Sequence, residues 1–226
     1  MTDYTFTYRT LSEALYESLI DDPFYITLEK AIRGTQLEKK EMMLRYMDYS
    51  MIEAEHAGQI LIPTEHKYGA SVWLKPQKEK EREQLKSEKK EFLIKHLGQN
   101  AWQCYASIVN YMSQQADPLI PPDAWYLSIV GLRPAHQNKG LGSGLIIPVL
   151  EKTDGLGITT YLETFTPRNM KFYEKLGYTS IASFNELEIE TIRELIEGNY
   201  RIVYKINQDY VGIVRVHHSS RQLLAD

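Results

Sequence analysis

The sequence predicts an α/β (α+β) fold, with helices packed on a mixed, mostly antiparallel central sheet. Three features of the 226 residues lead to this class: a nearly continuous apolar run at 124–132, a glycine-punctuated loop directly after it, and a long amphipathic pattern at 36–57. An apolar run of that length is typical of a central strand covered on both faces. Alternating strand and helix patterns before and after it suit one α/β domain.

The first 120 residues alternate between strand and helix patterns. Residues 5–9 alternate in Thr, Tyr and Phe and predict a first strand, and residues 11–20 predict a helix that the Asp-Asp-Pro at 21–23 ends. Residues 36–57 predict the clearest helix, with Gly58 as its cap and strands at 59–64 and 70–74. Its apolar stripe comprises Leu37, Leu44, Met47, Met51 and Ala54.

Two further helices are predicted before the central strand. Nearly every residue between 78 and 95 is charged, which favours a solvated helix carrying i to i+4 ion pairs over a partner-binding tract. Residues 100–115 form an aromatic-bearing helical pattern that ends near Asp117-Pro118. The region before 121 therefore supplies most of the predicted helices.

The elements after the central strand are shorter. We expect a helix at 139–156 that Pro148 kinks, because proline removes an internal hydrogen bond. A helix that begins near Pro167 should end at the cap Gly177. The remaining predictions are strands at 159–163, 178–184, 200–206 and 210–216, and a short acidic helix at 186–197 followed by a turn at 198–199.

Composition excludes several classes of function. A net charge of −4 gives no basic face for nucleic acid, and no apolar run approaches the roughly 18 residues of a membrane span. The single cysteine, Cys104, excludes an internal disulfide and suits a reducing compartment. With no signal-peptide pattern at the start, these features predict a cytoplasmic protein that binds neither membrane nor nucleic acid.

The glycine loop is the main functional signal. It carries backbone N–H groups towards one point at the predicted start of a helix, where the helix dipole favours an anion such as a diphosphate. Downstream, Asn169 and Tyr173 are four residues apart and share one face of the helix predicted there. The loop itself reads Gln137, Asn138, Lys139, Gly140, Leu141, Gly142, Ser143.

These segments resemble the Gcn5-related N-acetyltransferase (GNAT) superfamily. Its Gln/Arg-x-x-Gly-x-Gly/Ala signature is matched from Gln137 to Gly142, and VGLRPAHQNKGLGSGL, YLETFTPRN and FYEKLGY are similar, in order, to the puromycin N-acetyltransferase-like branch. The resemblance covers roughly residues 4–184. It implies a GNAT domain over 1–206, with the substrate side mainly in 1–120, the acetyl-CoA side in 121–206, a sheet splayed at the acetyl-CoA site, and a C-terminal extension over 207–226.

The resemblance also implies which residues hold acetyl-CoA. The strand at 127–132 should pair with the pantetheine arm, with the backbone N–H of Val130 facing the thioester oxygen. Lys139 adds charge attraction or is simply an exposed lysine, and Asn138 replaces a glycine of the branch at a position where asparagine tolerates left-handed backbone. The expected acetyl-CoA-binding residues are Ile129, Val130, Gly131, Leu132, Gln137, Asn138, Lys139, Gly140, Leu141, Gly142, Ser143, Asn169 and Phe172.

Two residues are candidates for proton transfer. Tyr173 matches the tyrosine that GNAT enzymes often carry near the CoA sulfur, and a tyrosine hydroxyl is protonated at neutral pH. Spacing alone favours a packed helix-face aromatic for Tyr173, and the resemblance to the family reverses that preference. Glu163 either accepts a proton from the amine, directly or through water, or ties down the loop after its strand.

The expected activity is acetyl transfer to a primary amine of a small molecule. No metal is expected, since His56 and His66 have no ligand spacing with other residues. Protein N-terminal or lysine acetylation, and acyl-CoA binding without turnover, remain alternatives, and a homodimer stays open. Aromatics available on the substrate side, most of them expected to be core, are Phe24, Tyr25, Tyr46, Tyr49, Trp73, Trp102 and Tyr105.

Overall fold

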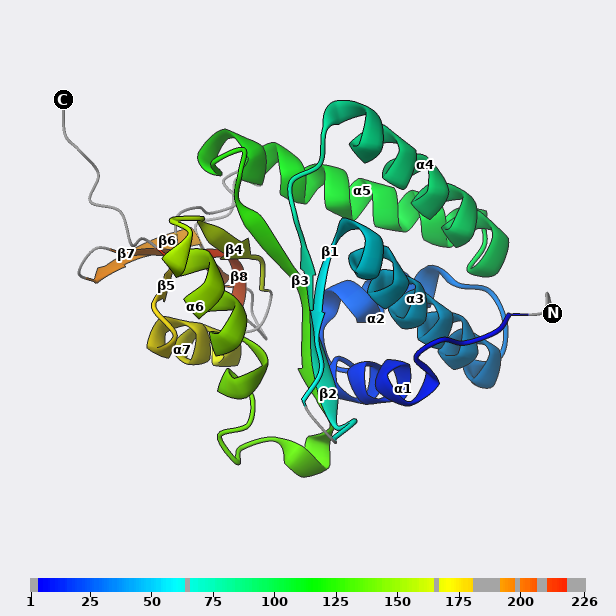
Figure 1. Ribbon diagram of the computed structural model, residues 1–226. Helices are drawn as coiled ribbons and strands as arrows, with labels where there is room; N and C mark the ends of the chain where they lie inside the picture. Colours follow the sequence, from blue (N-terminus) through cyan, green and yellow to red (C-terminus); the bar gives the residue numbers. More distant parts are fainter. Residues whose placement is uncertain are drawn as a thin grey trace. The chain divides into compact units, whose positions relative to one another are not determined.

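The computed structural model describes residues 4–63, 66–164, 167–180, 192–197, 200–206 and 211–218. The chain forms two compact units, one of residues 1–111 with 129–146 and one of residues 112–128 with 147–226. Strand β3 (Trp125–Leu132) contributes its first four residues to the second unit and its last four to the first. Figure 1 shows the helices and strands of both units.

The first unit is a helical layer on a short antiparallel sheet. Strands β1 (Gly58–Leu61) and β2 (Gly69–Leu74) pair from Gly58↔Leu74 to Leu61↔Ser71. Helices α1, α2 and α3 lie on the same side of these strands (Figure 1). The helices of this region are α1 (Arg9–Ser18), α2 (Pro23–Ala31), α3 (Gln36–Ala57), α4 (Glu79–His96) and α5 (Gln99–Ala116).

The core of the first unit lies between α1, α3 and β2. Leu15, Leu28 and Met47 are fully buried there. Burial of such side chains contributes roughly 1.5–3 kcal/mol each. Four residues of the predicted α3 stripe are buried as expected, but Leu37 is 81% exposed and does not belong to it. The buried stripe therefore begins at Leu44, about two turns later than the pattern suggested.

The predicted first strand at 5–9 is wrong. Residues 4–8 run as an irregular segment into α1, and the buried carboxylate of Asp48 on α3 holds them in place. The hydroxyl of Tyr4 donates to Asp48 over 2.7 Å, and the backbone N–H groups of Thr7 and Tyr8 donate to it over 3.2 and 2.5 Å. The Asp48 carboxylate thus accepts from two backbone N–H groups of the segment, in place of a neighbouring strand.

Helix starts in this unit follow capping rules. Asp22 accepts a hydrogen bond from the Phe24 N–H over 2.9 Å, and Pro23 occupies the first turn of α2, a helix that is not among the predicted elements. Thr35 and Glu38 form a capping box at the start of α3. The bounds predicted for α3 are confirmed.

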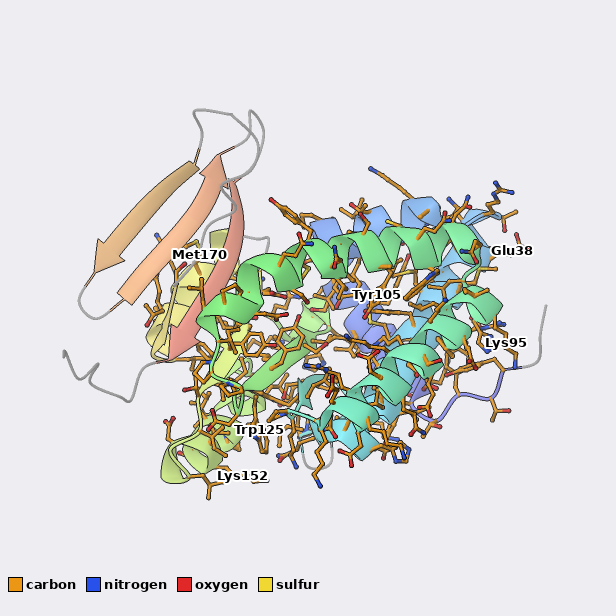
Figure 2. All side chains as sticks on the ribbon, turned by 90° about the horizontal axis from the view of Figure 1, so that it is seen from above. Glu38, Lys95, Tyr105, Trp125, Lys152 and Met170 are labelled. Carbon is orange, nitrogen blue, oxygen red and sulfur yellow. The ribbon has the colours of Figure 1, made fainter. Side chains whose placement is uncertain are left out.

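The second unit holds most of the sheet. Strand β3 pairs in parallel with β4 (Thr160–Leu162), from Trp125↔Thr160 to Leu127↔Leu162. Helix α6 (Ile147–Gly155) lies between them in sequence, and Lys152 on α6 places its ammonium 5.3 Å from the ring centre of Trp125 on β3 (Figure 2). Strand β3 continues five residues beyond Leu127, where the sheet was expected to splay.

The remaining strands of the second unit are antiparallel. Their order is β4-β8-β7-β6, and β5 also pairs with β8. With one parallel pair among antiparallel ones, the sheet is mixed, and the predicted fold class is confirmed. The strands are β5 (Tyr178–Thr179), β6 (Ile192–Glu197), β7 (Tyr200–Ile206) and β8 (Val211–His218).

Two predictions near the C-terminus need correction. Residues 192–197 form strand β6 rather than the end of an acidic helix, because they pair with β7 from Ile192↔Lys205 to Glu197↔Tyr200. The rest of that predicted helix (186–191) and the turn at 198–199 lie outside the described residues. His217 and His218 are the last two residues of β8. The expected C-terminal extension, 207–226, thus contains a strand that pairs with β4, β5 and β7.

Within the part of the chain that the structure describes, no helix is both long enough and apolar enough to cross a bilayer.

Candidate active site

The end of β3 lies tightly against its neighbours in the first unit. A Cβ on Gly131 would come within 2.9 Å of the Ser18 side chain, and a Cβ on Gly69 would come within 2.2 Å of the Gly131 carbonyl oxygen. The N–H of Leu132 donates to Ser18 Oγ over 3.0 Å. Glycine at 131 therefore allows α1 to approach this strand, and glycine at 69 allows β2 to do so. Ile129 packs in the core, while Val130 and Leu132 are half-buried.

Arg133 and Gln137 anchor the start of the glycine loop. The N–H of Arg133 donates to the Tyr68 carbonyl over 2.8 Å, and its guanidinium reaches the Thr10 carbonyl and the carboxylates of Glu13 and Glu17 on α1. The Gln137 side chain turns back and donates to the Leu132 carbonyl over 2.9 Å. Gln137, the first residue of the signature, thus holds the loop through its side chain.

The loop has the backbone conformation of an anion cradle. Asn138 has φ 59° and Gly140 has φ 75°, so two left-handed residues alternate with ordinary ones. Such alternation turns successive N–H groups towards one side, as in anion-binding nests. Among the described residues we find no acceptor for the N–H groups of Gly140, Leu141 and Gly142. The expectation that asparagine at 138 tolerates the left-handed region is confirmed.

The loop does not open directly into an α-helix, as we had predicted. A 3₁₀ turn, η3 (Ser143–Leu145), follows it, and α6 begins only at Ile147. Pro148 therefore lies in the first turn of α6, where its missing N–H costs no internal bond, and the predicted kink at Pro148 is wrong. The Ser71 hydroxyl on β2 donates to the Leu145 carbonyl over 2.5 Å, which holds the 3₁₀ turn to the first unit.

The other expected cofactor contacts lie on α7 (Pro167–Lys175) in the second unit. Asn169 and Tyr173 are both on this helix, so their four-residue spacing is helical as predicted. Tyr173 is 5% exposed, and its ring packs edge-on against Phe172 at 5.2 Å and against Tyr178 at 5.9 Å. Asn169 and Phe172 are half-buried. The burial and the ring contacts of Tyr173 thus agree with its interpretation as a packed helix-face aromatic.

Tyr178 is the most deeply buried member of this group. Its hydroxyl accepts a hydrogen bond from Thr160 Oγ1 over 3.1 Å. Burial raises the pKa of Tyr178 strongly, against the opposing hydrogen bond from Thr160. Tyr178 therefore stays a neutral phenol next to Tyr173.

Glu163 has a partner that the sequence reading did not identify. The Tyr126 hydroxyl on β3 donates to Glu163 Oε2 over 3.2 Å, and the Tyr126 ring stacks on Tyr161 at 4.8 Å. Glu163 is half-buried directly after β4. Tyr126 and Tyr161 occupy matching positions of the parallel pair, which explains the stacking. A strand alignment of 125–127 with 160–162 would have been needed to find this contact.

Most of the substrate-side aromatics are core residues, as expected. Tyr46 and Trp73 are buried, and Phe24, Tyr25, Trp102 and Tyr105 pack against the core of the first unit. Tyr49 stacks on Phe92 with ring centres 4.0 Å apart.

The charged helix α4 is less uniformly solvated than its composition implies. Lys89 is 8% exposed, and its ammonium lies 2.5 Å from Glu53 on α3. The Tyr105 ring on α5 is 5.8 Å from that ammonium, and Tyr105 is labelled in Figure 2. Sequence reasoning missed this pair because no short-range spacing links the two residues.

One hollow of about 330 Å³ lies at the junction of α4 and α5. It is lined by Arg33, Lys95, His96 and other residues, and it includes none of the expected cofactor-binding residues. Among the described residues, no three His, Cys, Asp or Glu side chains are grouped as a metal site.

The second unit has a mixed sheet with a β3-α6-β4 crossover, and the glycine loop follows β3. Residues 65–178 match the acetyltransferase (GNAT) family. That stretch runs from the approach to β2, through β3 and the loop, to the start of β5. Because the match spans half of the chain, this protein belongs to the GNAT family.

Solved structures agree with this fold assignment. A protein from Corynebacterium glutamicum described as histone acetyltransferase HPA2 and related acetyltransferase has a TM-score of 0.58 at 14% identity, covering 96% of this chain and 93% of that one. Arylalkylamine N-acetyltransferase 2 from Aedes aegypti has a TM-score of 0.56 at 11% identity, covering 95% and 94%. A mosquito arylalkylamine N-acetyltransferase like 5b has a TM-score of 0.53 at 14% identity, covering 92% of each chain.

Proposed function

We propose that the protein is an acetyl-CoA-dependent N-acetyltransferase that acetylates a primary amine of a small molecule by direct attack in a ternary complex. The observation that carries this is the glycine loop, where left-handed Asn138 and Gly140 expose consecutive N–H groups suited to a diphosphate. Family membership supports the donor, since GNAT enzymes generally use acetyl-CoA. We further propose that the protein is most similar to the puromycin N-acetyltransferase-like branch and that it acts in the cytoplasm.

The proposed binding roles fall to separate groups of residues. The co-substrate supplies an acetyl group activated as a thioester. We propose that residues 137–143 hold its diphosphate and that 129–132, Asn169 and Phe172 hold its pantetheine arm. The N–H of Val130 would donate to the carbonyl oxygen as negative charge develops there, an interaction worth roughly 3 kcal/mol in comparable sites.

Proton transfer is assigned to Tyr173 and Glu163. As the amine nitrogen bonds to the carbonyl carbon and the carbon–sulfur bond breaks, the Tyr173 hydroxyl gives a proton to the departing sulfur. Glu163 takes the proton that the attacking nitrogen loses, with Tyr126 orienting its carboxylate. The half-buried position of Glu163 supports contact with both solvent and substrate.

Arylalkylamines are the first acceptors to test, because two of the enzymes with similar folds are named for them. Protein N-terminal or lysine acetylation is the second candidate, favoured by the fold shared with a protein described as a histone acetyltransferase. An acyl-CoA-binding module without turnover is the third. Thiol release from acetyl-CoA should be measured over a panel of arylalkylamines, puromycin, and peptides with a free N-terminus or lysine.

The Tyr173→Phe variant tests the proposed acid. General acid catalysis contributes about 100-fold or more, so kcat should fall by about that factor while KM for acetyl-CoA stays similar. Tyr111→Phe removes the hydroxyl of a more exposed tyrosine on α5 and serves as the matched control. Unchanged turnover in Tyr173→Phe removes Tyr173 from this role, and CoA binding with no turnover on any amine would leave the binding module as the function.

A further inference from the structure

Three rings form a column beside the start of the glycine loop. The His66 and Tyr68 ring centres are 5.6 Å apart, and those of Tyr68 and His136 are 5.0 Å apart with planes only 18° from parallel. His66 is exposed, while Tyr68 and His136 are half-buried. The column is open to solvent at its exposed member, His66, and we call it the ring column.

Backbone hydrogen bonds fix the ring column to the loop. The Arg133 N–H donates to the Tyr68 carbonyl over 2.8 Å, and the His136 N–H donates to the Arg133 carbonyl over 2.8 Å. His136 is the last residue of the 3₁₀ turn η2 (Pro134–His136), so Gln137 and the cradle follow it directly. All of these residues, and the loop residues proposed for the diphosphate, belong to the first unit.

Two lysines next to these elements are available for an anion. Lys67 lies between His66 and Tyr68, and Lys139 lies in the loop, and both are exposed. No ion pair among the described residues engages either of them, whereas Arg133 is held by Glu13 and Glu17. Surface rings together with unpaired cations are the combination that recognises a base and a phosphate.

We propose that the ring column is the subsite for the nucleotide end of acetyl-CoA: the purine base stacks on the column, and Lys67 binds the 3′-phosphate. This inference rests on the proposed function. The ribose joins the base covalently to the diphosphate, so a diphosphate at Gly140–Gly142 keeps the base within reach of the ring column beside the loop. Base-on-ring stacking tolerates variation in ring type, which suits a column of two imidazoles and a phenol.

Binding measurements test the subsite without any turnover. Calorimetric titration with CoA and with adenosine 3′,5′-bisphosphate should show a dissociation constant about tenfold higher for His136→Ala than for the wild-type protein, which corresponds to about 1.4 kcal/mol. His136→Phe keeps a ring and should restore binding. His56→Ala removes an exposed histidine on α3 and should bind as the wild type does.

A second experiment compares acetyl-CoA with donors that lack part of the nucleotide. With a reactive amine, His136→Ala and Tyr68→Leu should lower kcat/KM for acetyl-CoA but leave it unchanged for acetyl-pantetheine, which lacks the nucleotide. Lys67→Ala should reduce the preference for CoA over dephospho-CoA, which lacks only the 3′-phosphate. Titration with adenosine, which carries no phosphate, measures the contribution of base stacking to binding apart from that of the phosphate contacts.

Wild-type affinity of His136→Ala and Tyr68→Leu for adenosine 3′,5′-bisphosphate would overturn the proposal. Equal losses with acetyl-CoA and acetyl-pantetheine would also overturn it, because the column would then act on the loop rather than on the base. If CoA binds but no amine is acetylated, the proposed function fails while the titrations still decide the subsite.

Discussion

The ammonium of Lys89 lies 2.5 Å from a carboxylate oxygen of Glu53, with both side chains about nine-tenths buried between α4 and α3. Three rings surround the ammonium at 5.5–5.8 Å, those of Tyr46, Tyr49 and Tyr105. Desolvation lowers the pKa of Lys89, but the attraction of Glu53 and the neighbouring groups outweighs it, so the pKa is raised overall. The pair is therefore ionised at neutral pH and joins two helices through a charged contact inside an aromatic shell.

Removing the charge of only one partner of this pair should lower the free energy of unfolding substantially. Glu53→Gln leaves the Lys89 ammonium buried without a counter-charge, and we expect about 3 kcal/mol lower unfolding free energy in urea at pH 7. The double variant Glu53→Gln/Lys89→Met should recover much of that loss, because no buried charge remains. Glu83→Gln disrupts the exposed pair with Lys86 and should change stability by less than about 1 kcal/mol. Equal effects of Glu53→Gln and Glu83→Gln would contradict this interpretation of the buried pair.

The N-terminal segment depends on one carboxylate. Asp48 accepts from Tyr4, Thr7 and Tyr8 and is fully buried. Asp48→Ala removes every one of these acceptors, and we expect about 3 kcal/mol or more of destabilisation in urea unfolding. Asp48→Asn keeps one carbonyl oxygen in the same place and should cost less. Proteolysis within residues 4–8 should accelerate in Asp48→Ala; an unchanged cleavage rate would mean that other contacts hold the segment.

The sequence predicted the elements whose stabilising contacts are local. Helix α3 has its capping box and its apolar period within its own 22 residues, and its bounds were predicted correctly. Gly177, with φ 84°, ends α7 as a left-handed cap, which was also readable from the sequence. The loop conformation at Asn138 and Gly140 followed from residue type in the same way.

Predictions were wrong where distant residues decide the structure. Alternation at 5–9 resembled a strand, but Asp48, about forty residues away in sequence, supplies the acceptors instead. An acidic stretch resembled a helix, yet pairing with β7 makes 192–197 a strand. The Tyr126–Glu163 contact depends on the register of β3 and β4, which no local pattern encodes. Tertiary pairing overrides weak local propensity in each case.

His96 should make stability depend on pH. Burial lowers its pKa, and the nearby cations Arg45 and Lys95 lower it further. In the unfolded chain a histidine titrates near 6.5, so as the pH falls below about 6.5 the unfolded state takes up a proton before the folded state does. The stabilisation is complete above that pH and is lost as the pH falls towards the lower folded value. Urea midpoints at pH 7, 6 and 5 should fall less steeply in His96→Gln than in the wild-type protein.

The exposed His56 provides the comparison for that experiment. His56→Gln should keep the wild-type pH profile. Parallel profiles for wild type and His96→Gln would show that other groups carry the pH dependence.

The backbone of the glycine loop can be tested at one position. Gly140 has φ 75°, and a Cβ built on it meets no atom within 4 Å, so the obstacle to a side chain is conformational strain rather than a clash. Gly140→Ala should cost about 1 kcal/mol of stability and distort the cradle, which should raise the dissociation constant for CoA about tenfold in calorimetric titrations. Gly140→Asn should retain more binding than Gly140→Ala, because asparagine already adopts the left-handed region at 138 in the same loop. Gly155→Ala, at the end of α6 with equal space around its Cβ, controls for the added methyl group. Weaker binding in Gly140→Asn than in Gly140→Ala would show that free space, rather than backbone conformation, limits this position.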